Sequence, residues 1–212
     1  MNSDSKHQVK TLRDRLRRAT ENEILNAAEQ VLAEVGLDSA SMHVIAERAG
    51  IAVGTIYNYF NDREALLAAL FHARRSDLQE RMEACVKANA GLPFRKQLTG
   101  FVRTVFDEFD AHRPFFRVVM EIEHLRHHAL IMASPEQPAP VMKQIAERAK
   151  KMIQRGVREG LLKPENSEYY SGVLTGILRG LFFQNVQREG FSFVELTDFA
   201  VAVFLHGVSV HT

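Results

Sequence analysis

The sequence is poor in cysteine and lacks tryptophan. Cys85 is the one cysteine among 212 residues, which excludes an internal disulfide and is typical of a reducing compartment. No apolar run approaches the roughly 20 residues that a helix needs to span a bilayer. The N-terminus is charged instead of apolar, which argues against a signal peptide. We therefore expect a soluble, cytoplasmic protein that makes no contact with a membrane.

Sequence motifs of the common enzyme classes are also missing. The chain has no G-x-S-x-G nucleophile turn, no H-E-x-x-H zinc helix and no glycine-rich loop that would cradle a phosphate. Cys85 has no activating neighbours in the sequence. We therefore predict that the protein is not an enzyme, has no catalytic residues and needs no cofactor.

Helical periodicity, in contrast, runs through the chain. Apolar residues make up 46% of it, enough for a sizeable core, and they recur at spacings of three and four. This pattern predicts an all-α fold of about nine helices, with a three-helix N-terminal domain and a larger helical C-terminal domain. Residues 133–140, ASPEQPAP, contain three prolines and are expected to form a loop.

Several helix ends are predicted from capping residues. Thr20, with Glu23 three residues later, has the pattern of a capping box that opens the first helix, and Gly36 should end that helix. A long helix should follow Asn61, and Ser192 should open the last helix.

Residues 41–60, SMHVIAERAGIAVGTIYNYF, predict two short helices joined by a tight turn. Ser41 is an N-cap candidate for the first helix, and Gly50 closes it. Each helix has an apolar inner face, formed by Met42, Ile45, Ala46 and Ala49 in the first and by Val53, Ile56, Tyr57 and Phe60 in the second. Thr55, Asn58 and Tyr59 point away from the core. This pattern is typical of a helix-turn-helix, although a hairpin that only packs would also produce it.

Together with its flanking residues, the motif resembles the DNA-binding domain of the TetR/AcrR family of bacterial one-component repressors. The resemblance runs from about residue 18 to 78, and beyond residue 80 only the length and the run of helices are similar. Ala52 departs from the capping serine that the family often has, and Arg63 stands where a lysine is common. The matching residues are Ile24, Ala27, Ala28, Leu32, Gly36, Ile45, Ala46, residues 49–51, residues 54–60 and residues 63–66.

The resemblance implies a domain organisation and a function. Residues 1–17 would form a basic arm, residues 18–78 a DNA-binding domain, and residues 79–212 a helical effector-binding and dimerisation domain. The protein would be a homodimer on palindromic, double-stranded operator DNA, most simply a repressor. In the family, a ligand beside the long fourth helix moves the two DNA-binding heads out of register with the DNA. A constitutive architectural or division-linked DNA-binding factor without an effector remains the alternative.

Positive charge is concentrated before the first predicted helix. Residues 6–18 hold six cations against one aspartate, whereas residues 19–78 hold four arginines against nine acids. Phosphate contacts supply much of the affinity for DNA, so the arm should contribute strongly unless it is only a solvated tail. Gly54 would admit close backbone approach, and Asn58 could bond adenine bidentately. The residues predicted to contact DNA are Arg17, Arg18, Ser41, Gly54, Thr55, Tyr57, Asn58, Tyr59 and Arg63.

Large apolar side chains in the C-terminal domain are candidates for an apolar cavity. Most must fill the core, as aromatic residues at helical spacing commonly do. Because no dense cluster of charge indicates a small polar ligand, we predict an apolar effector of moderate size. The predicted lining residues are Phe101, Val105, Phe106, Phe109, Phe116, Met120, Tyr170 and Phe183.

Two further patterns leave alternatives open. Gly172, Gly176 and Gly180 recur every four residues, which suggests that something approaches this face of the eighth helix closely. The resemblance places helices 8 and 9 in the dimer interface, but a crossing helix of the same subunit would explain the glycines equally. His124 and His128 could chelate a metal from one helix face, or simply favour a helix C-terminus. No metal site is predicted, since cysteine partners are missing nearby and histidines near a helix end are common.

Overall fold

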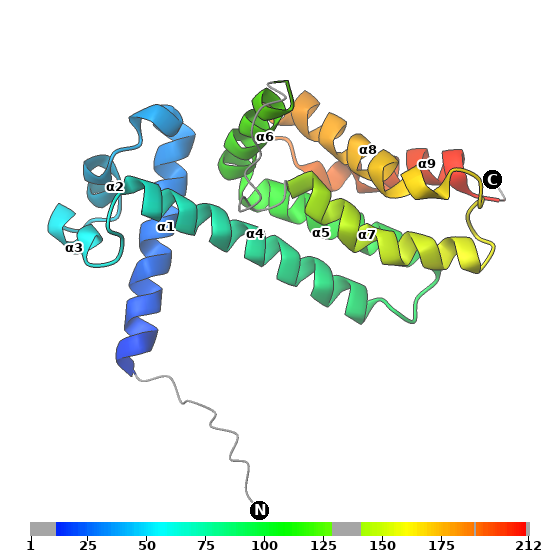
Figure 1. Cartoon of the computed structure of the whole chain (residues 1–212), viewed down its shortest axis with the longest axis horizontal. Coiled ribbons are helices and arrows are strands. Elements are labelled where there is room, and N and C mark those ends of the chain that lie inside the picture. Colours follow the sequence, from blue (N-terminus) through cyan, green and yellow to red (C-terminus); the bar gives the residue numbers. More distant parts are fainter. Residues whose placement is uncertain (1–11, 129–140, 189, 211–212) are drawn as a thin grey trace, which may run out of the picture. The chain divides into compact units, whose positions relative to one another are not determined.

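The computed structural model describes residues 12–128, 141–188 and 190–210. Within these ranges the chain forms nine α-helices and two short 3-10 helices, and its extended pairing is limited to one bridge between Leu162 and Ser209. The predicted all-α fold is confirmed. The chain divides into two compact units between His72 and Ala73, inside α4 (Arg63–Ala88) (Figure 1). None of the helices in these ranges combines the length and the apolar composition needed to cross a membrane.

The first unit is built from α1 (Leu12–Ser39), α2 (Met42–Arg48), α3 (Val53–Tyr57) and the first turns of α4. α1 packs against α2, and α2 packs against α3. Apolar residues spaced by three or four place one face of each helix in a shared core. The almost fully buried residues of this core include Ile24, Ala28, Val31, Leu32, Ala40, Ile45, Ala46, Ile56, Leu66 and Leu70.

α1 begins earlier than predicted. Thr20 lies inside the helix, where its hydroxyl donates a hydrogen bond to the carbonyl of Leu16 at 3.0 Å, so the predicted capping box does not form. The arginine and leucine residues before Thr20 are good helix formers and extend the helix back to Leu12. At the other end, Gly36 adopts a φ of 75° that interrupts the helical geometry, as predicted.

The cap of α4 also differs from the prediction by one residue. The carboxylate of Asp62, and not Asn61, accepts a hydrogen bond from the N–H of Ala65 at 2.7 Å. Asp62 therefore satisfies one of the amide groups that a helix N-terminus leaves without an intrahelical partner.

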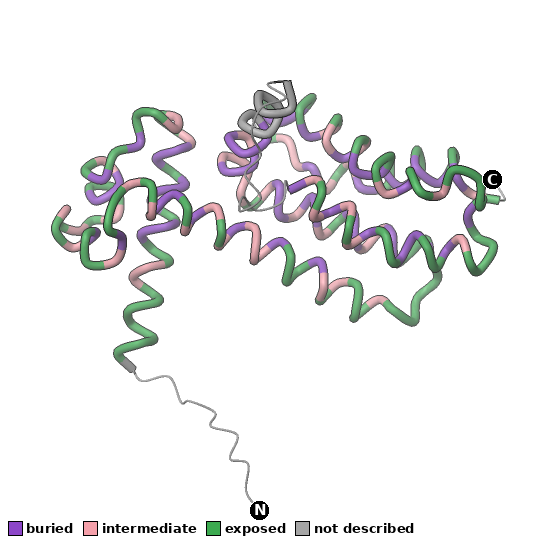
Figure 2. Tube along the Cα trace, viewed as in Figure 1, coloured by how far each residue is buried: buried purple, intermediate pink, exposed green. Residues whose placement is uncertain are grey.

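The second unit contains the rest of α4, and its other elements follow in chain order. They are α5 (Phe94–Ala111), α6 (Arg113–His128), α7 (Val141–Arg158), η1 (Ser167–Tyr169), α8 (Tyr170–Asn185), η2 (Phe193–Leu196) and α9 (Thr197–Val208). α7 packs along α8, α5 along α9, and α8 along α9. In Figure 2 the buried positions of these helices follow their inward faces.

The start of the last helix is the third cap that differs from its prediction. Ser192 precedes the 3-10 turn η2 instead of α9, and its hydroxyl donates to Asp110 Oδ2 at 2.7 Å. α9 begins at Thr197. The Ser192 hydroxyl therefore binds Asp110 on the distant helix α5. It does not cap α9, which the local sequence pattern predicted.

A cluster of phenylalanines fills the core near the end of α5. The ring of Phe109 meets those of Phe116 and Phe182 at centroid distances of 4.9 Å, both edge to face. Phe193 stacks on Phe182 at 5.1 Å. All four side chains are fully buried, and each such pair adds about 0.5–1.5 kcal/mol beyond burial. The cluster therefore joins α5, α6, α8 and η2.

Candidate functional site

The helix-turn-helix predicted at residues 41–60 is present as α2, a turn and α3. Ser41 caps α2, its hydroxyl oxygen accepting a hydrogen bond from the N–H of Val44 at 3.3 Å. Gly50 turns the chain with a φ of 66°, a conformation that side chains with a Cβ rarely adopt. Ala52 precedes α3 and makes no side-chain cap, consistent with the missing hydroxyl.

α3 buries one face and leaves the other open. Ile56 is fully buried and Phe60 nearly so, whereas Gly54 and Asn58 are exposed and Thr55 is half-buried. A Cβ added to Gly54 would meet nothing within 4 Å among the residues that the structure describes. The outer face of α3 can therefore come close to an external surface.

Tyr57 does not belong to the inner face, contrary to prediction. Its side chain is 52% exposed, so it joins the outer face of α3. The spacing placed Tyr57 at the border of the apolar stripe, and α3 is only five residues long, too short to cover both flanks of that stripe. The phenol hydroxyl is consequently presented outward.

Tyr59 links the end of the helix-turn-helix to α1. It is half-buried, and the guanidinium of Arg17 lies 5.7 Å from the centre of its ring, within the range of a cation–π contact. The first turns of α1 are otherwise exposed from Arg13 to Ala19. The contact therefore holds the basic end of α1 beside α3 and leaves Arg18 open to solvent.

The two arginines of the first unit that lie outside α1 are used within the fold. Arg48 hydrogen-bonds Glu34 through Nη1 at 2.8 Å, and this bond lowers the pKa of Glu34 and raises that of Arg48. Arg63 is part-buried and donates to the backbone carbonyls of Ala40 and Leu37. Arg63 therefore fastens the start of α4 to the loop after α1. Its contact with DNA stays a prediction.

The exposed positive charge of this unit is consequently concentrated on the first turns of α1. Among the described residues these cations are Arg13, Arg15, Arg17 and Arg18, all exposed. The other two predicted arm cations, Lys6 and Lys10, lie outside the described residues. A polyanion that contacts the outer face of α3 would thus meet its main counter-charge at the start of α1.

Seven of the eight predicted ligand-lining residues are buried in the second unit. Phe101, Val105, Phe106, Phe109 and Phe116 are fully buried, Met120 is 2% exposed and Tyr170 is 7% exposed. The Tyr170 hydroxyl donates to the carbonyl of Glu165 at 2.9 Å, and burial raises its pKa. In this conformation the side chains pack against one another as core.

Phe183 is the exception. It is 36% exposed on α8, and the guanidinium of Arg179 lies 5.6 Å from its ring centre. Because Phe183 and the buried Phe182 are adjacent on one helix, they face different directions. Phe183 therefore belongs to the outer surface, which corrects its prediction as a lining residue.

That outer surface of α8 and α9 is apolar. A Cβ added to Gly172, Gly176 or Gly180 would meet nothing within 4 Å, so no helix of the described chain crosses there. The intrasubunit explanation of these glycines is therefore wrong for the described residues. Large exposed apolar side chains on the same two helices are Val173, Phe183, Phe199 and Val203.

A buried acid in the second unit was missed by the sequence analysis. Glu108 on α5 is fully buried, and its carboxylate forms an ion pair with Arg81 of α4. Burial raises the pKa of Glu108 above its ordinary value of 4.5, although Arg81 opposes this change. The one available signal was a glutamate between the apolar positions Val105 and Phe109.

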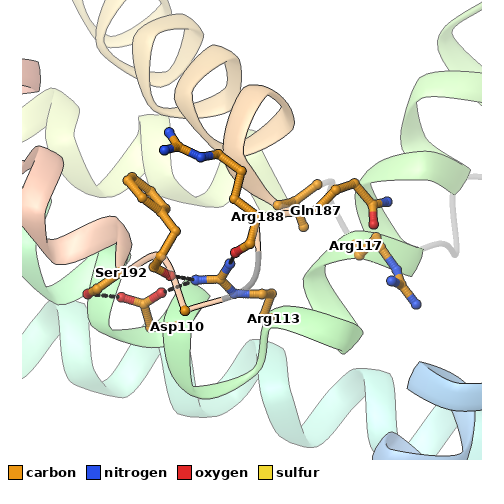
Figure 3. A pocket seen from close by; sticks show the side chains of 9 residues that line it. Asp110, Arg113, Arg117, Gln187, Arg188 and Ser192 are labelled. Atoms are coloured by element: carbon orange, nitrogen blue, oxygen red, sulfur yellow. Dashed lines mark hydrogen bonds and ion pairs between the residues drawn. The ribbon is translucent and has the colours of Figure 1, made fainter.

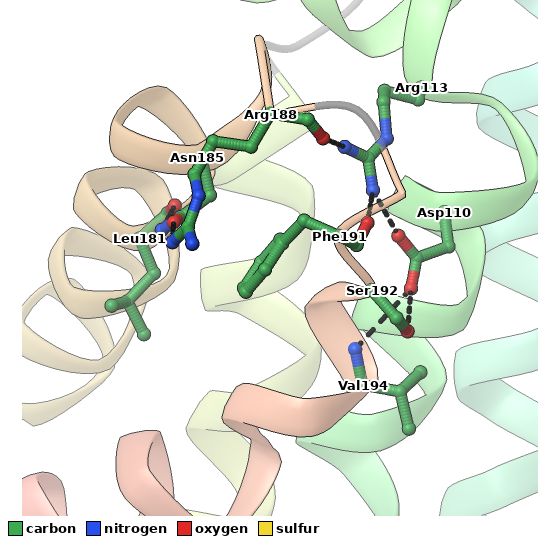
Figure 4. A network of polar contacts seen from close by, with 8 residues as sticks. All are labelled: Asp110, Arg113, Leu181, Asn185, Arg188, Phe191, Ser192 and Val194. Atoms are coloured by element: carbon green, nitrogen blue, oxygen red, sulfur yellow. Dashed lines mark hydrogen bonds and ion pairs between the residues drawn. The ribbon is translucent and has the colours of Figure 1, made fainter.

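A polar network closes the corner between α5 and the segment after α8 (Figure 4). Arg113 donates to Asp110 Oδ1 at 2.7 Å and to the backbone carbonyls of Arg188 and Phe191. Asp110 also accepts hydrogen bonds from Ser192 and from the N–H of Val194. Partial burial raises the pKa of Asp110, but these bonds and that from the Phe193 N–H outweigh it and hold the pKa below its ordinary value.

Beside this network lies an open cleft of about 550 Å³. Figure 3 shows that its lining side chains come from the α5–α6 corner and from the segment that follows α8. Three of them are arginines: Arg113, Arg117 and Arg188. The side chains of the candidate metal ligands His124 and His128 lie outside the described residues, and the described residues contain no group of three metal-binding side chains.

Comparison with known proteins identifies relatives of the N-terminal residues. Residues 24–70 match the family of bacterial regulatory proteins, tetR family. Over 68 residues, the chain is 41% identical to the fatty acid metabolism regulator protein of Bacillus subtilis (strain 168). That match covers 32% of this chain and 35% of the relative, so the chain spans only about a third of its length.

Solved structures resemble the chain over most of its length. A fatty acid degradation regulator, FadR from Bacillus halodurans, has a TM-score of 0.70 at 21% identity, covering 88% of this chain and 94% of that one. SmeT, the repressor of the Stenotrophomonas maltophilia efflux pump SmeDEF, has a TM-score of 0.70 at 16% identity, covering 92% and 93%. At such identities, the likeness establishes the fold alone.

Proposed function

We propose that this chain, which belongs to the tetR family of bacterial regulatory proteins through its N-terminal domain, regulates transcription by binding operator DNA. The outer face of α3 carries the proposal. Gly54 and Asn58 are exposed there, while Ile56 anchors the opposite face in the core. A helix held in this way can enter a major groove while the rest of the unit stays outside.

The exposed residues have separable roles in this proposal. Asn58 reads a base, since an asparagine amide bonds adenine bidentately and such a pair is worth about 1–3 kcal/mol of discrimination. Gly54 and Thr55 allow close approach of α3. Tyr57, Ser41 and the basic start of α1 contact phosphates, which position the protein without selecting sequence.

Selection from a library of random DNA duplexes tests this function without a known operator. We expect enrichment of a two-fold symmetric sequence whose half-sites lie about 10 base pairs, one helical turn, apart. Asn58→Ala should enrich a more degenerate sequence. Recovery of unselected sequences by the wild-type protein would contradict sequence-specific regulation.

We further propose that the apolar face of α8 and α9 forms the dimer interface. Four large exposed apolar side chains and three unobstructed glycines share these helices, and such contiguous surfaces mark interaction sites. A two-fold dimer would also supply two reading helices, which successive major grooves require about 34–36 Å apart.

Gly176→Leu separates the interface from the stability of the subunit. A Cβ at this position would meet nothing within 4 Å among the described residues, and leucine is a better helix former than glycine, which costs roughly 0.8–1 kcal/mol relative to alanine. The melting temperature of the subunit should therefore not fall in the variant. Light scattering should nevertheless show a smaller fraction of dimer than in the wild type. Ala84→Leu, which adds a leucine to an exposed position of α4, is the control and should leave the dimer unchanged. A monomeric wild type at micromolar concentration would sink the proposal.

Release of DNA by a mainly apolar small molecule completes the proposed function. The FadR and SmeT relatives are named for fatty acid degradation and for an efflux pump. To move the protein from 1:99 to 99:1 between two states, a ligand must prefer one by about 5.5 kcal/mol. At roughly 25 cal/mol per Å², this corresponds to about 220 Å² of additional apolar burial. The phenylalanine core would have to open to provide that area.

The packed core keeps the effector-free alternative relevant. Because the buried phenylalanines fill the predicted ligand region in this conformation, a constitutive DNA-binding factor needs no rearrangement at all. Hydrophobic compounds should raise thermal stability and release operator DNA together if an effector exists. Compounds that bind tightly without altering DNA affinity would favour the constitutive factor.

A further inference from the structure

The face of α9 that points away from the core contains a histidine. Phe199 and Val203 are 56% and 45% exposed on this face. His206 is exposed beside them, since residues spaced by four and by three lie above one another on a helix. The opposite face of α9, which includes Phe204, is buried. The outward stripe of α9 therefore combines two large apolar side chains with one that can gain a proton.

Large exposed side chains of other segments lie beside the end of α9 that carries His206. The ring of Tyr170, at the start of α8, lies 6.3 Å from that of Phe204, so the start of α8 is next to the end of α9. After α9, the N–H of Val210 donates to the carbonyl of Leu161 at 3.3 Å. The large exposed side chains of these neighbouring segments are Leu161, Tyr169, Val173 and Val210. The surroundings of His206 are therefore mainly apolar.

No described carboxylate neutralises a proton on His206. Within the described ranges, no residue forms a hydrogen bond or an ion pair with this side chain. Asp198 lies eight residues earlier on α9, about 12 Å along the helix axis. Lys163, whose N–H donates to the carbonyl of Val208 at 2.8 Å, adds positive charge beside the end of α9. The other charged side chains on the elements that pack against α9 are Arg95, Lys96, Arg103, Asp107, Glu108 and Asp110 of α5, Arg179 of α8 and Glu195 of η2, with Glu168 of η1 next to α8.

A proton on His206 has a different cost in the subunit and in a dimer. An imidazole gains its proton between pH 5 and 8, and at an exposed position water solvates both forms. If a second copy covers this face, the protonated form loses that water, which costs far more than burying the neutral form. The helix C-terminus favours the positive charge in both states, so it does not offset this difference.

We propose that His206 makes dimerisation depend on pH, because the neutral imidazole is buried in the interface and the protonated form is left in separate subunits. This inference rests on the proposed dimer interface of α8 and α9. Separate subunits bind more protons than the dimer, so the dimer gains stability as pH rises through the titration of the imidazole and loses it as pH falls. With two copies of His206 in each dimer, the dimerisation constant should fall by up to about 100-fold per pH unit. Operator binding, which needs both reading helices, should weaken with it.

Sedimentation equilibrium of the full chain tests the inference directly. It measures the dimerisation constant from about pH 8 to about pH 5.5, which spans most of the range in which imidazole titrates. The wild-type constant should be at least about 10-fold lower at the acidic end of this range. Circular dichroism at each pH verifies that the subunit stays folded. A dimerisation constant that does not change over this range would overturn the inference.

Two substitutions at His206 show whether its charge is responsible. His206→Gln keeps a polar side chain that cannot gain a proton, so its dimerisation constant should not change with pH. His206→Lys carries a positive charge throughout the range and should dimerise weakly even at its basic end. His43→Gln, which removes an exposed histidine of α2 in the first unit, is the matched control and should keep the pH dependence of the wild type. Equal pH dependence in His206→Gln and the wild type, or full dimerisation of His206→Lys, would also overturn the inference.

The wild type at the basic end of the range separates this inference from the proposed function. A monomer there would defeat the proposed interface and the inference with it. A dimer that does not respond to pH would defeat the inference alone and leave the interface standing. At protein concentrations near the dimerisation constant, acidification should lower the operator affinity of the wild type more than that of His206→Gln. An equal fall in both proteins would overturn the link between His206 and DNA binding.

Discussion

The basic start of α1 offers the sharpest test of how the protein holds DNA. We expect Arg17→Gln/Arg18→Gln to weaken operator binding and to flatten its dependence on salt. Both side chains are exposed, and Arg17 is held beside α3 by its contact with the Tyr59 ring. The arginines of the first unit outside α1, Arg48 and Arg63, are engaged within the fold, so they cannot replace the lost charge.

The size of the effect follows from counterion release. The logarithm of the binding constant falls with the logarithm of salt concentration by about 0.9 for each phosphate neutralised. Because the double substitution removes two phosphate-binding cations from each subunit of a dimer, it should reduce the slope by about 3.6. Between 50 and 200 mM salt, the wild type should therefore lose roughly 150-fold more affinity than the variant.

Fluorescence anisotropy with labelled operator, repeated across that salt range, measures both slopes. Lys150→Gln/Lys151→Gln removes the same charge from exposed positions of α7 and is the matched control. Its slope should remain that of the wild type. An unchanged slope for the arginine variant, or equal flattening in both variants, would refute the assignment of phosphate contacts to α1.

Three further predictions concern single residues. Asn58→Ala should reduce the preference for operator over random DNA by about 1–3 kcal/mol while leaving non-specific affinity intact, as competition binding would reveal; equal loss of both would indicate a phosphate role instead. Arg63→Gln should lower the thermal stability of the first unit, because the carbonyls of Ala40 and Leu37 lose their donor; an unaltered melting curve would contradict this. Glu108 binds its proton more tightly in the folded chain, so its contribution to stability is complete below pH 4.5 and is lost as pH rises through the higher folded pKa. Glu108→Gln should therefore gain stability relative to the wild type as pH rises above 4.5, and a parallel pH dependence of both proteins would disprove it.

The helix-turn-helix was predictable because its signals are local. The spacing of Met42, Ile45 and Ala46 sets one buried face within seven residues, and Ser41 and Gly50 mark the two ends of that helix. The concentration of arginines before residue 19 can likewise be seen in the sequence without knowledge of the fold. The sequence by itself therefore determined the all-α fold, the position of the reading helix and the uneven distribution of charge.

The tertiary structure decided which side chains are available to a partner. Periodicity assigns a residue to a helix face but does not say which element covers that face, so Phe183 and Tyr57 both looked internal. Arg63 donates to a carbonyl 26 residues away, and Arg113 to one 78 residues away. Such partners are brought together only by packing. The arginine-lined cleft, the open glycines of α8 and the buried Glu108 are consequently features of the folded chain, because each depends on contacts, or on their absence, between segments distant in sequence.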